Sequence, residues 1–203
     1  TNPCERIKSL KEEDKKRTAI SPEDLKRITK YLSENDPYYL LVCRMEYYTF
    51  IRPEELTNIK LCDINLKEQK ILVASNISKN RRDGMVGLND EIIKQMIDLH
   101  IFDNDTNCYL FSKGFKPGYK KITTRVIRDR FYKLRSVLKL PDTYLFYSFK
   151  DSGIRDLANS AGIVVARDQA RHTDISTTNK YLKGSSPVSY THLRAHETSQ
   201  DLV

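Results

Sequence analysis

Long hydrophobic runs are missing from this 203-residue sequence. No apolar segment approaches the length of about eighteen residues needed to cross a bilayer, and no charged-then-apolar leader opens the chain. The sequence therefore predicts no membrane-spanning helix. It begins at Thr1 rather than at methionine, so we expect a fragment of a longer protein whose upstream domain is missing.

Cysteine is also scarce, and its placement excludes a structural role in metal binding. The four cysteines lie far apart in the sequence, and none forms a C-x-x-C pair. We interpret Cys43 and Cys62, which have apolar neighbours, as small buried hydrophobic residues. This pattern predicts no zinc site and favours a reducing, intracellular setting.

Positive charge, in contrast, is in excess. Apolar residues make up 39% of the chain and charged residues 31%, which is ordinary for a soluble globular domain. The formal net charge of +8 favours a polyanionic partner without identifying one. A basic protein that is merely soluble remains the alternative at this stage.

The pattern of caps and hydrophobic periods predicts a mainly helical fold with one small antiparallel, three-stranded sheet. Residues 1–20 are mixed in charge with little apolar periodicity, and we interpret them as a linker from the missing domain. Ser21-Pro22 and Asp36-Pro37 are each typical of a helix start. The period changes to two between residues 61 and 86, which predicts the sheet. Further helices are predicted after Asn89, at 121–138, on both sides of Gly162, and up to Tyr181.

Two groups of basic residues are candidates for DNA contact. One is the predicted hairpin tip, Lys79-Asn80-Arg81-Arg82, although such a basic tip is more often plain solvated surface than a site. The other is a face of the 121–138 helix, where residues recur at a spacing of four and three: Lys121, Arg125, Arg128, Tyr132 and Arg135. Such a stripe suits the DNA backbone or a groove, but a solvated helix face remains an equal alternative.

Arg52 lies in an apolar segment where a charge needs a partner. Pro53 begins a short helix, so Arg52 is expected at a turn between packed helices. An unpaired buried charge is very costly, and Glu55 is a candidate partner three residues later. The alternative to a functional site is an ion pair that only fixes the turn.

His172 and Tyr181 are separated by nine residues, with a helix-start signal between them. One tyrosine among twelve means little by itself. It gains meaning if the chain also supplies a phosphate-binding cation, a proton acceptor and a cation for a leaving group.

Taken in order, these segments resemble the catalytic domain of tyrosine recombinases, the phage integrase and Xer-like family, over residues 21–184. The resemblance implies a metal-independent, cofactor-free DNA strand transferase. Its five matching places are Thr49 to Leu56 with Arg52, Lys79 seven residues before Val86, Tyr147-Ser148-Phe149-Lys150, His172, and Tyr181. Phe149 to Ile154 also resembles variants from mobile elements of Bacteroides-like bacteria.

The resemblance implies a role for each of these residues. Arg52 binds the scissile phosphate, with Glu55 as its acidic neighbour, and Lys79 protonates the leaving 5′-oxygen. His172 matches the histidine of the third motif, and Tyr181 matches the nucleophile that forms a 3′-phosphotyrosine. The resemblance further implies double-stranded DNA sites as the partner, a homotetramer on DNA in the intact protein, and a bacterial cytoplasmic location.

The second motif departs from the family pattern. Tyr147 and Lys150 stand where the family has His-x-x-Arg, and lysine supplies the charge of an arginine without its two-pronged fork. Tyr147 can donate one hydrogen bond to phosphate but cannot act as an imidazole base. We therefore expect activity that is retained, but that is either lowered or dependent on partner subunits. The alternative is a degenerate copy that binds DNA without cutting it.

A metal-dependent nuclease is a third hypothesis, and the absence of a clustered Asp/Glu/His set in the sequence argues against it. Residues 188–203 resemble the translation of a sequencing adapter, so we expect a non-native tail after a catalytic domain spanning 21–187. This excludes His192 and His196, whose i, i+4 spacing would otherwise suggest zinc.

Overall fold

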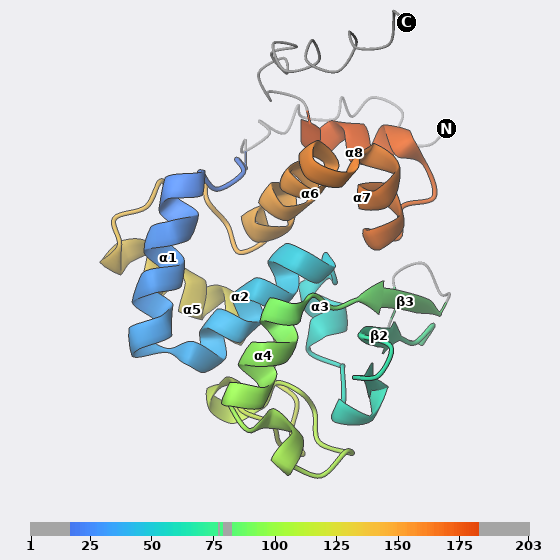
Figure 1. Ribbon diagram of the computed structural model, residues 1–203. Helices are drawn as coiled ribbons and strands as arrows, with labels where there is room; N and C mark the ends of the chain where they lie inside the picture. The colour runs from blue at the N-terminus through green and yellow to red at the C-terminus, as the bar shows by residue number, and fades with distance from the viewer. Residues whose placement is uncertain (1–16, 77, 79–82, 183–203) are drawn as a thin grey trace, which may run out of the picture.

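The computed structural model describes residues 17–76, 78 and 83–182, and these residues form a mainly helical domain (Figure 1). The α-helices are α1 Pro22–Asn35, α2 Pro37–Thr49, α3 Pro53–Leu56, α4 Asp90–Asp98, α5 Thr124–Val137, α6 Ser148–Ala161, α7 Ile163–Gln169 and α8 Ile175–Leu182. Short 3-10 helices occur at η2 Leu61–Asp63, η3 Ile101–Asp103 and η4 Lys113–Phe115. The predicted helical fold class is confirmed. Within the described ranges, no helix has the length and apolar character to cross a membrane.

The first two helices begin where their caps were predicted. The Ser21 side chain accepts a hydrogen bond from the backbone of Asp24, and that of Asp36 accepts one from Tyr39. Both caps satisfy backbone donors that a helix start leaves open, and proline follows each at the first helical position.

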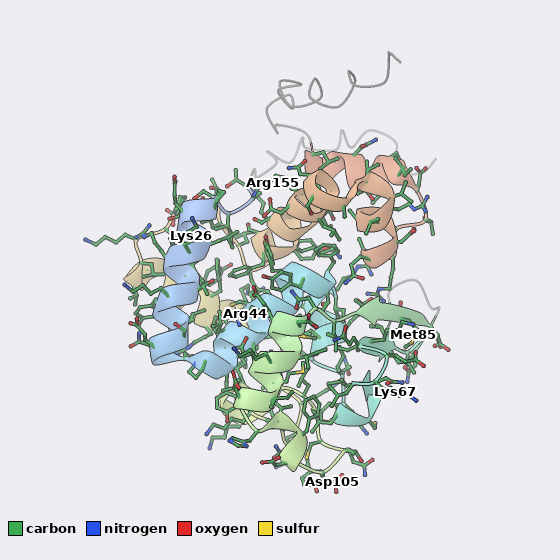
Figure 2. The ribbon with its side chains drawn as sticks, viewed as in Figure 1. Lys26, Arg44, Lys67, Met85, Asp105 and Arg155 are labelled. Atoms are coloured by element: carbon green, nitrogen blue, oxygen red, sulfur yellow. The ribbon has the colours of Figure 1, made fainter. Side chains whose placement is uncertain are left out.

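A single antiparallel sheet has the order β1-β2-β3. Its strands are β1 Ile64–Asn65, β2 Lys70–Val73 and β3 Gly84–Gly87. Ile71 pairs with Val86, and both are fully buried, as the period of two predicts. The neighbouring residue Met85 points to the other face and is 49% exposed (Figure 2).

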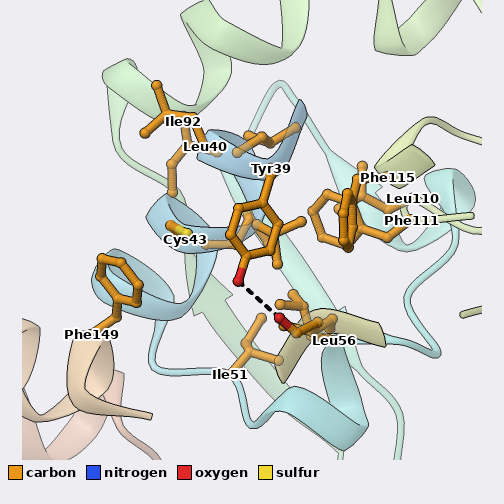
Figure 3. Close-up of a cluster of buried hydrophobic side chains, with 14 of the residues drawn as sticks. Tyr39, Leu40, Cys43, Ile51, Leu56, Ile92, Leu110, Phe111, Phe115 and Phe149 are labelled. Atoms are coloured by element: carbon orange, nitrogen blue, oxygen red, sulfur yellow. Dashed lines mark hydrogen bonds between the residues drawn. The ribbon is translucent and has the colours of Figure 1, made fainter. Parts of the chain in front are cut away.

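The main hydrophobic core is built around α2, which packs against α1, α4 and α6. Tyr39 is fully buried there among aromatic and aliphatic side chains (Figure 3). Its hydroxyl donates a 2.9 Å hydrogen bond to the carbonyl of Ile127, which joins α2 to α5. This bond satisfies the one polar atom that burial of the ring would otherwise leave unpaired.

A second, smaller cluster holds the three C-terminal helices together. Phe50, Ile154, Ala166 and Ala170 form its buried part, and the ring of Tyr181 packs against it. In Figure 1, α6, α7 and α8 accordingly lie together on one side of the molecule. The position of α8, and hence of Tyr181, depends on this cluster.

Three sequence predictions need correction. Residues 17–20 belong to the fold rather than to a solvated linker, because Ile20 is fully buried and its backbone bonds the Ser152 hydroxyl. Cys62 is exposed, not a buried hydrophobic residue. Helix α5 begins at Thr124, three residues after the predicted start. Lys79, Arg81, Arg82 and the 188–203 tail lie outside the described residues.

Gly153 sets the closeness of α6 to α2. A Cβ atom at this position would lie 1.8 Å from the carbonyl oxygen of Tyr47 and 2.7 Å from the Phe50 ring. Neither neighbour is a flexible side-chain end, so only glycine permits this approach.

We predict that Gly153→Ala lowers the free energy of unfolding by about 1–3 kcal/mol or more, because overpacking outweighs the gain in helix propensity. Thermal and chemical denaturation measure the change. Asn159→Ala, at an exposed position on the same helix, is the matched control and should be neutral or slightly stabilising. Equal stability of Gly153→Ala and the native chain would contradict the close approach.

Candidate active site

The turn between α2 and α3 places Arg52 at the start of α3. Phe50, which ends α2, has a left-handed φ of 56°, an uncommon conformation for a bulky residue. The ammonium of Lys150 donates a 2.7 Å hydrogen bond to the Phe50 carbonyl. The Thr49 hydroxyl accepts from the backbone of Ile51 at 3.3 Å. These contacts stabilise a turn that backbone preferences alone disfavour.

Glu55 connects two arginines that are far apart in the sequence. One carboxylate oxygen lies 3.1 Å from Nη1 of Arg52, and the other accepts the Arg52 backbone N–H at 3.0 Å. That second oxygen also accepts a hydrogen bond from Nη2 of Arg171. Burial by itself would raise the pKa of Glu55, but Arg171 and Arg52 together hold it below its ordinary value. Glu55 is therefore ionised at neutral pH.

Arg171 lies in a backbone position that usually favours glycine. Its N–H bonds the carbonyl of Asp168, and that of His172 bonds the carbonyl of Arg167, both at 3.0 Å. These two bonds form a Schellman motif at the end of α7, with Arg171 in the left-handed conformation at φ 54°. For a residue with a Cβ this conformation costs about 1–2 kcal/mol.

His172 and Tyr181 face each other across the α7–α8 turn. Their rings are stacked, with centroids 5.7 Å apart and planes inclined by 18°. Nδ1 of His172 lies 3.0 Å from the hydroxyl of Thr178, a fully buried residue on α8. This contact holds the imidazole against the helix that carries Tyr181.

The two rings have shifted protonation equilibria. Burial, together with the nearby cations Lys150, Arg52 and Arg171, lowers the pKa of His172 to about 4. Burial and the Asp151 carboxylate raise the pKa of Tyr181, while Tyr147, Arg17 and Arg52 oppose that rise. At neutral pH the imidazole is therefore neutral and the phenol protonated.

Lys150 is fully buried, although it stands at the position of the second-motif arginine. Burial lowers its pKa, and burial raises that of Glu46, which is also fully buried on α2. Neither carboxylate oxygen of Glu46 has a hydrogen-bond partner within the described residues. The two groups attract one another electrostatically beneath the site, and the ammonium is directed to the Phe50 carbonyl.

Tyr147 lies between the N-terminal segment and the site. The guanidinium of Arg17 is 4.4 Å from the centre of its ring, and Nζ of Lys150 is 5.5 Å from it. Arg17 also forms a two-pronged ion pair with Asp151. Burial raises the pKa of Tyr147, and the neighbouring Tyr181 hydroxyl raises it further.

The structure brings together five of the predicted site residues: Arg52, Tyr147, Lys150, His172 and Tyr181. The predicted DNA-contacting residues on α5 and just before it differ from one another. Arg128 is exposed, whereas Arg125 pairs with Asp129 on the same helix. Arg135 donates to the carbonyls of Asp142 and Tyr144 and is tied to its own loop. The Lys121 ammonium bonds the side chain of Asn58 at 2.8 Å.

Sequence reasoning missed Arg17, Glu46 and Arg171. Arg17 lies within a mixed charged run that carries no local sign of burial. Glu46 follows an apolar helix pattern in which its depth depends on how α6 packs. Only Arg171 left a signal, because it occupies the helix-ending position before His172 where glycine is common.

We predict that Lys150→Met makes stability fall with rising pH. Without the ammonium, the pKa of buried Glu46 rises further above its unfolded value. When the pKa of a carboxyl is higher in the folded state than in the unfolded state, the free energy of unfolding decreases as pH rises from the unfolded pKa through the folded pKa. The decrease is at most about 1.4 kcal/mol per pH unit. Denaturant unfolding at pH 5, 7 and 9 measures this slope. The double variant Glu46→Gln/Lys150→Met should lack this slope. Equal slopes in the single and the double variant would contradict the electrostatic pairing of Glu46 with Lys150.

Solved structures of DNA recombinases share this fold. XerA recombinase matches with a TM-score of 0.67 and 22% identity over 82% of this chain and 60% of that one. The Tn1549 transposon integrase in complex with transposon right end DNA has values of 0.71 and 13%, over 87% and 65%. A lambda integrase dimer bound to a COC′ core site has 0.68 and 14%, over 86% and 62%. This chain thus spans less than two thirds of the length of each.

A search of curated proteins found no match. The model of the phage integrase family, however, matches residues 18–186, which include every described helix and strand of the fold. The match also covers the arginines joined by Glu55 and the stacked histidine and tyrosine. The chain therefore belongs to the phage integrase family, the tyrosine recombinases.

Proposed function

We propose that this chain is the catalytic domain of a site-specific DNA recombinase that cuts and rejoins strands through a 3′-phosphotyrosine. The observation that carries this proposal is the stacking of the Tyr181 ring on a neutral imidazole, with the positive charge of Arg52 acting to lower the pKa of both groups. Family membership and the DNA complexes among the structural neighbours support the same conclusion.

In the proposed cleavage step, the Tyr181 oxygen attacks the scissile phosphorus. A new bond forms between this oxygen and phosphorus, and the bond to the 5′-oxygen breaks with its electron pair on the departing oxygen. No oxidant, metal or nucleotide is needed, because the phosphodiester bond energy is retained in the protein–DNA linkage. Attack by another strand's 5′-hydroxyl reverses the step and joins new ends.

Tyr181 needs a proton acceptor because its pKa lies above the ordinary value for a phenol. The family motif assigns this role to His172, which is neutral at pH 7 and whose ring lies beside that of Tyr181. Protonation of the departing 5′-oxygen is assigned to Lys79, which remains a proposal from the family motif. Arg52 stabilises the charge that develops on the phosphate oxygens.

The intact protein would act on paired double-stranded DNA sites as a homo-oligomer, a tetramer by the family resemblance. Such work on DNA would place the protein in the bacterial cytoplasm. The basic residues of α5 and the hairpin residues Arg81 and Arg82 would contact the DNA backbone around the cleavage point.

Covalent capture tests the proposed chemistry. The chain is given a nicked duplex containing the junction sequence of the element that encodes it, in EDTA, and adducts are resolved on a denaturing gel. We expect an adduct with the native chain and with Tyr119→Phe, an exposed tyrosine remote from the site. Tyr181→Phe should form none. An adduct that survives in Tyr181→Phe would refute the assigned nucleophile, and its absence from the native chain would favour a binding module.

DNA affinity at several salt concentrations tests the role of α5. Arg128→Ala should reduce the slope of log affinity against log salt by about 0.9, the value for one lost phosphate contact. Lys133→Ala removes the same charge from a position turned by about 140° around the helix, and it should leave the slope nearly unchanged. Fluorescence anisotropy with a labelled duplex gives both values. Equal losses in the two variants would show only a general effect of net charge.

A further inference from the structure

A second guanidinium at the phosphate is the feature that the sequence motif lacks. Lys150 stands at the motif position, but its ammonium is fully buried and bonds the Phe50 carbonyl. In this arrangement Lys150 contributes charge from beneath the site. A second two-pronged phosphate contact would therefore need an arginine at another position.

Arg171 is held next to Arg52 by a shared anion. The two guanidinium groups bind the two oxygens of the Glu55 carboxylate, so they are separated by little more than one carboxylate and its hydrogen bonds. A phosphodiester is an anion, so a guanidinium pair held this close can bind its oxygens with charge-assisted hydrogen bonds.

The backbone around Arg171 is shaped to hold this side chain. Arg171 keeps the left-handed conformation at φ 54°, where glycine would fit without strain. On strand β3, a Cβ atom at Gly84 would lie 2.7 Å from Cδ of Arg171, so the missing side chain of Gly84 leaves room for the arginine stem. Arg171 also directly precedes His172 in the same helix-ending motif.

We propose that Arg171 supplies the second phosphate-binding guanidinium of this site, in place of the arginine that the second motif lacks. This inference rests on the proposed strand-transfer function. It makes Arg171 a catalytic residue that contacts a non-bridging oxygen of the scissile phosphate together with Arg52. The competing explanation is that Arg171 only fixes the α7–α8 turn to α3 through Glu55.

A neutral substrate separates these explanations. In a methylphosphonate, a methyl group replaces one non-bridging oxygen, so the scissile group has no charge for an arginine to neutralise. The cleavage position is first mapped from the adduct of the native chain, and matched nicked duplexes with phosphodiester or methylphosphonate at that position are prepared. Adduct formation is then timed for the native chain, Arg171→Gly, Arg171→Lys and Arg167→Ala.

Arg171→Gly suits the left-handed backbone, and Arg167→Ala removes an arginine of α7 that pairs with the adjacent Asp168. We expect Arg171→Gly to slow adduct formation on the phosphodiester by about 100-fold or more, the effect of losing one preorganised donor. On the methylphosphonate, Arg171→Gly should form the adduct less than about tenfold more slowly than the native chain, since this substrate has no negative charge for Arg171 to neutralise. Arg171→Lys should be intermediate, and Arg167→Ala should match the native chain on both substrates.

An equal deficit of Arg171→Gly on both substrates would overturn the proposal and assign Arg171 a structural role. A native rate in Arg171→Gly would overturn it as well. Melting temperatures of the variants show whether a deficit comes from unfolding. Failure of the native chain to form any adduct is a different result, because it would refute the strand-transfer function itself.

Discussion

The Glu55 carboxylate is the interaction on which the geometry of the site depends. It binds the backbone and guanidinium of Arg52 on one side and the guanidinium of Arg171 on the other. Two arginines this close would repel one another without an anion between them. Because Arg171 immediately precedes His172, the same carboxylate also fixes the backbone position from which the imidazole extends. Removal of the Glu55 carboxylate would therefore disturb Arg52, Arg171 and His172 together.

A second constraint comes from below the site. The close approach of α6 to α2 at Gly153 buries Lys150 and directs its ammonium to the carbonyl of Phe50. That bond stabilises the left-handed end of α2, from which Arg52 follows two residues later. Helix packing thus controls the position of Arg52, the proposed phosphate-binding residue, which belongs to neither helix. The stability of the core and the geometry of the site are coupled through this single turn.

The parts of the molecule that could be predicted are those determined by local sequence. The caps at Ser21 and Asp36, the alternation around Ile71 and the pairing of Arg52 with Glu55 involve residues close in sequence. The parts that could not be predicted depend on contacts between distant segments. Arg17 reaches Asp151 across most of the chain, and the burial of Lys150 follows from the rotation of α6. Spacing gives the motif position of Lys150 but not the direction of its side chain.

These constraints explain why lysine and arginine stand where they do. The space beneath the Phe50 turn offers the Lys150 ammonium one carbonyl and the field of a buried carboxylate, which suits a compact charge on a flexible stem. A guanidinium there would bring five donors to a space with few acceptors. The Arg171 guanidinium, in contrast, bonds the Glu55 carboxylate, and under our proposal it also binds the phosphate. Under our proposal, Lys150 therefore supplies charge beneath the Phe50 turn, and Arg171 supplies the hydrogen bonds to phosphate.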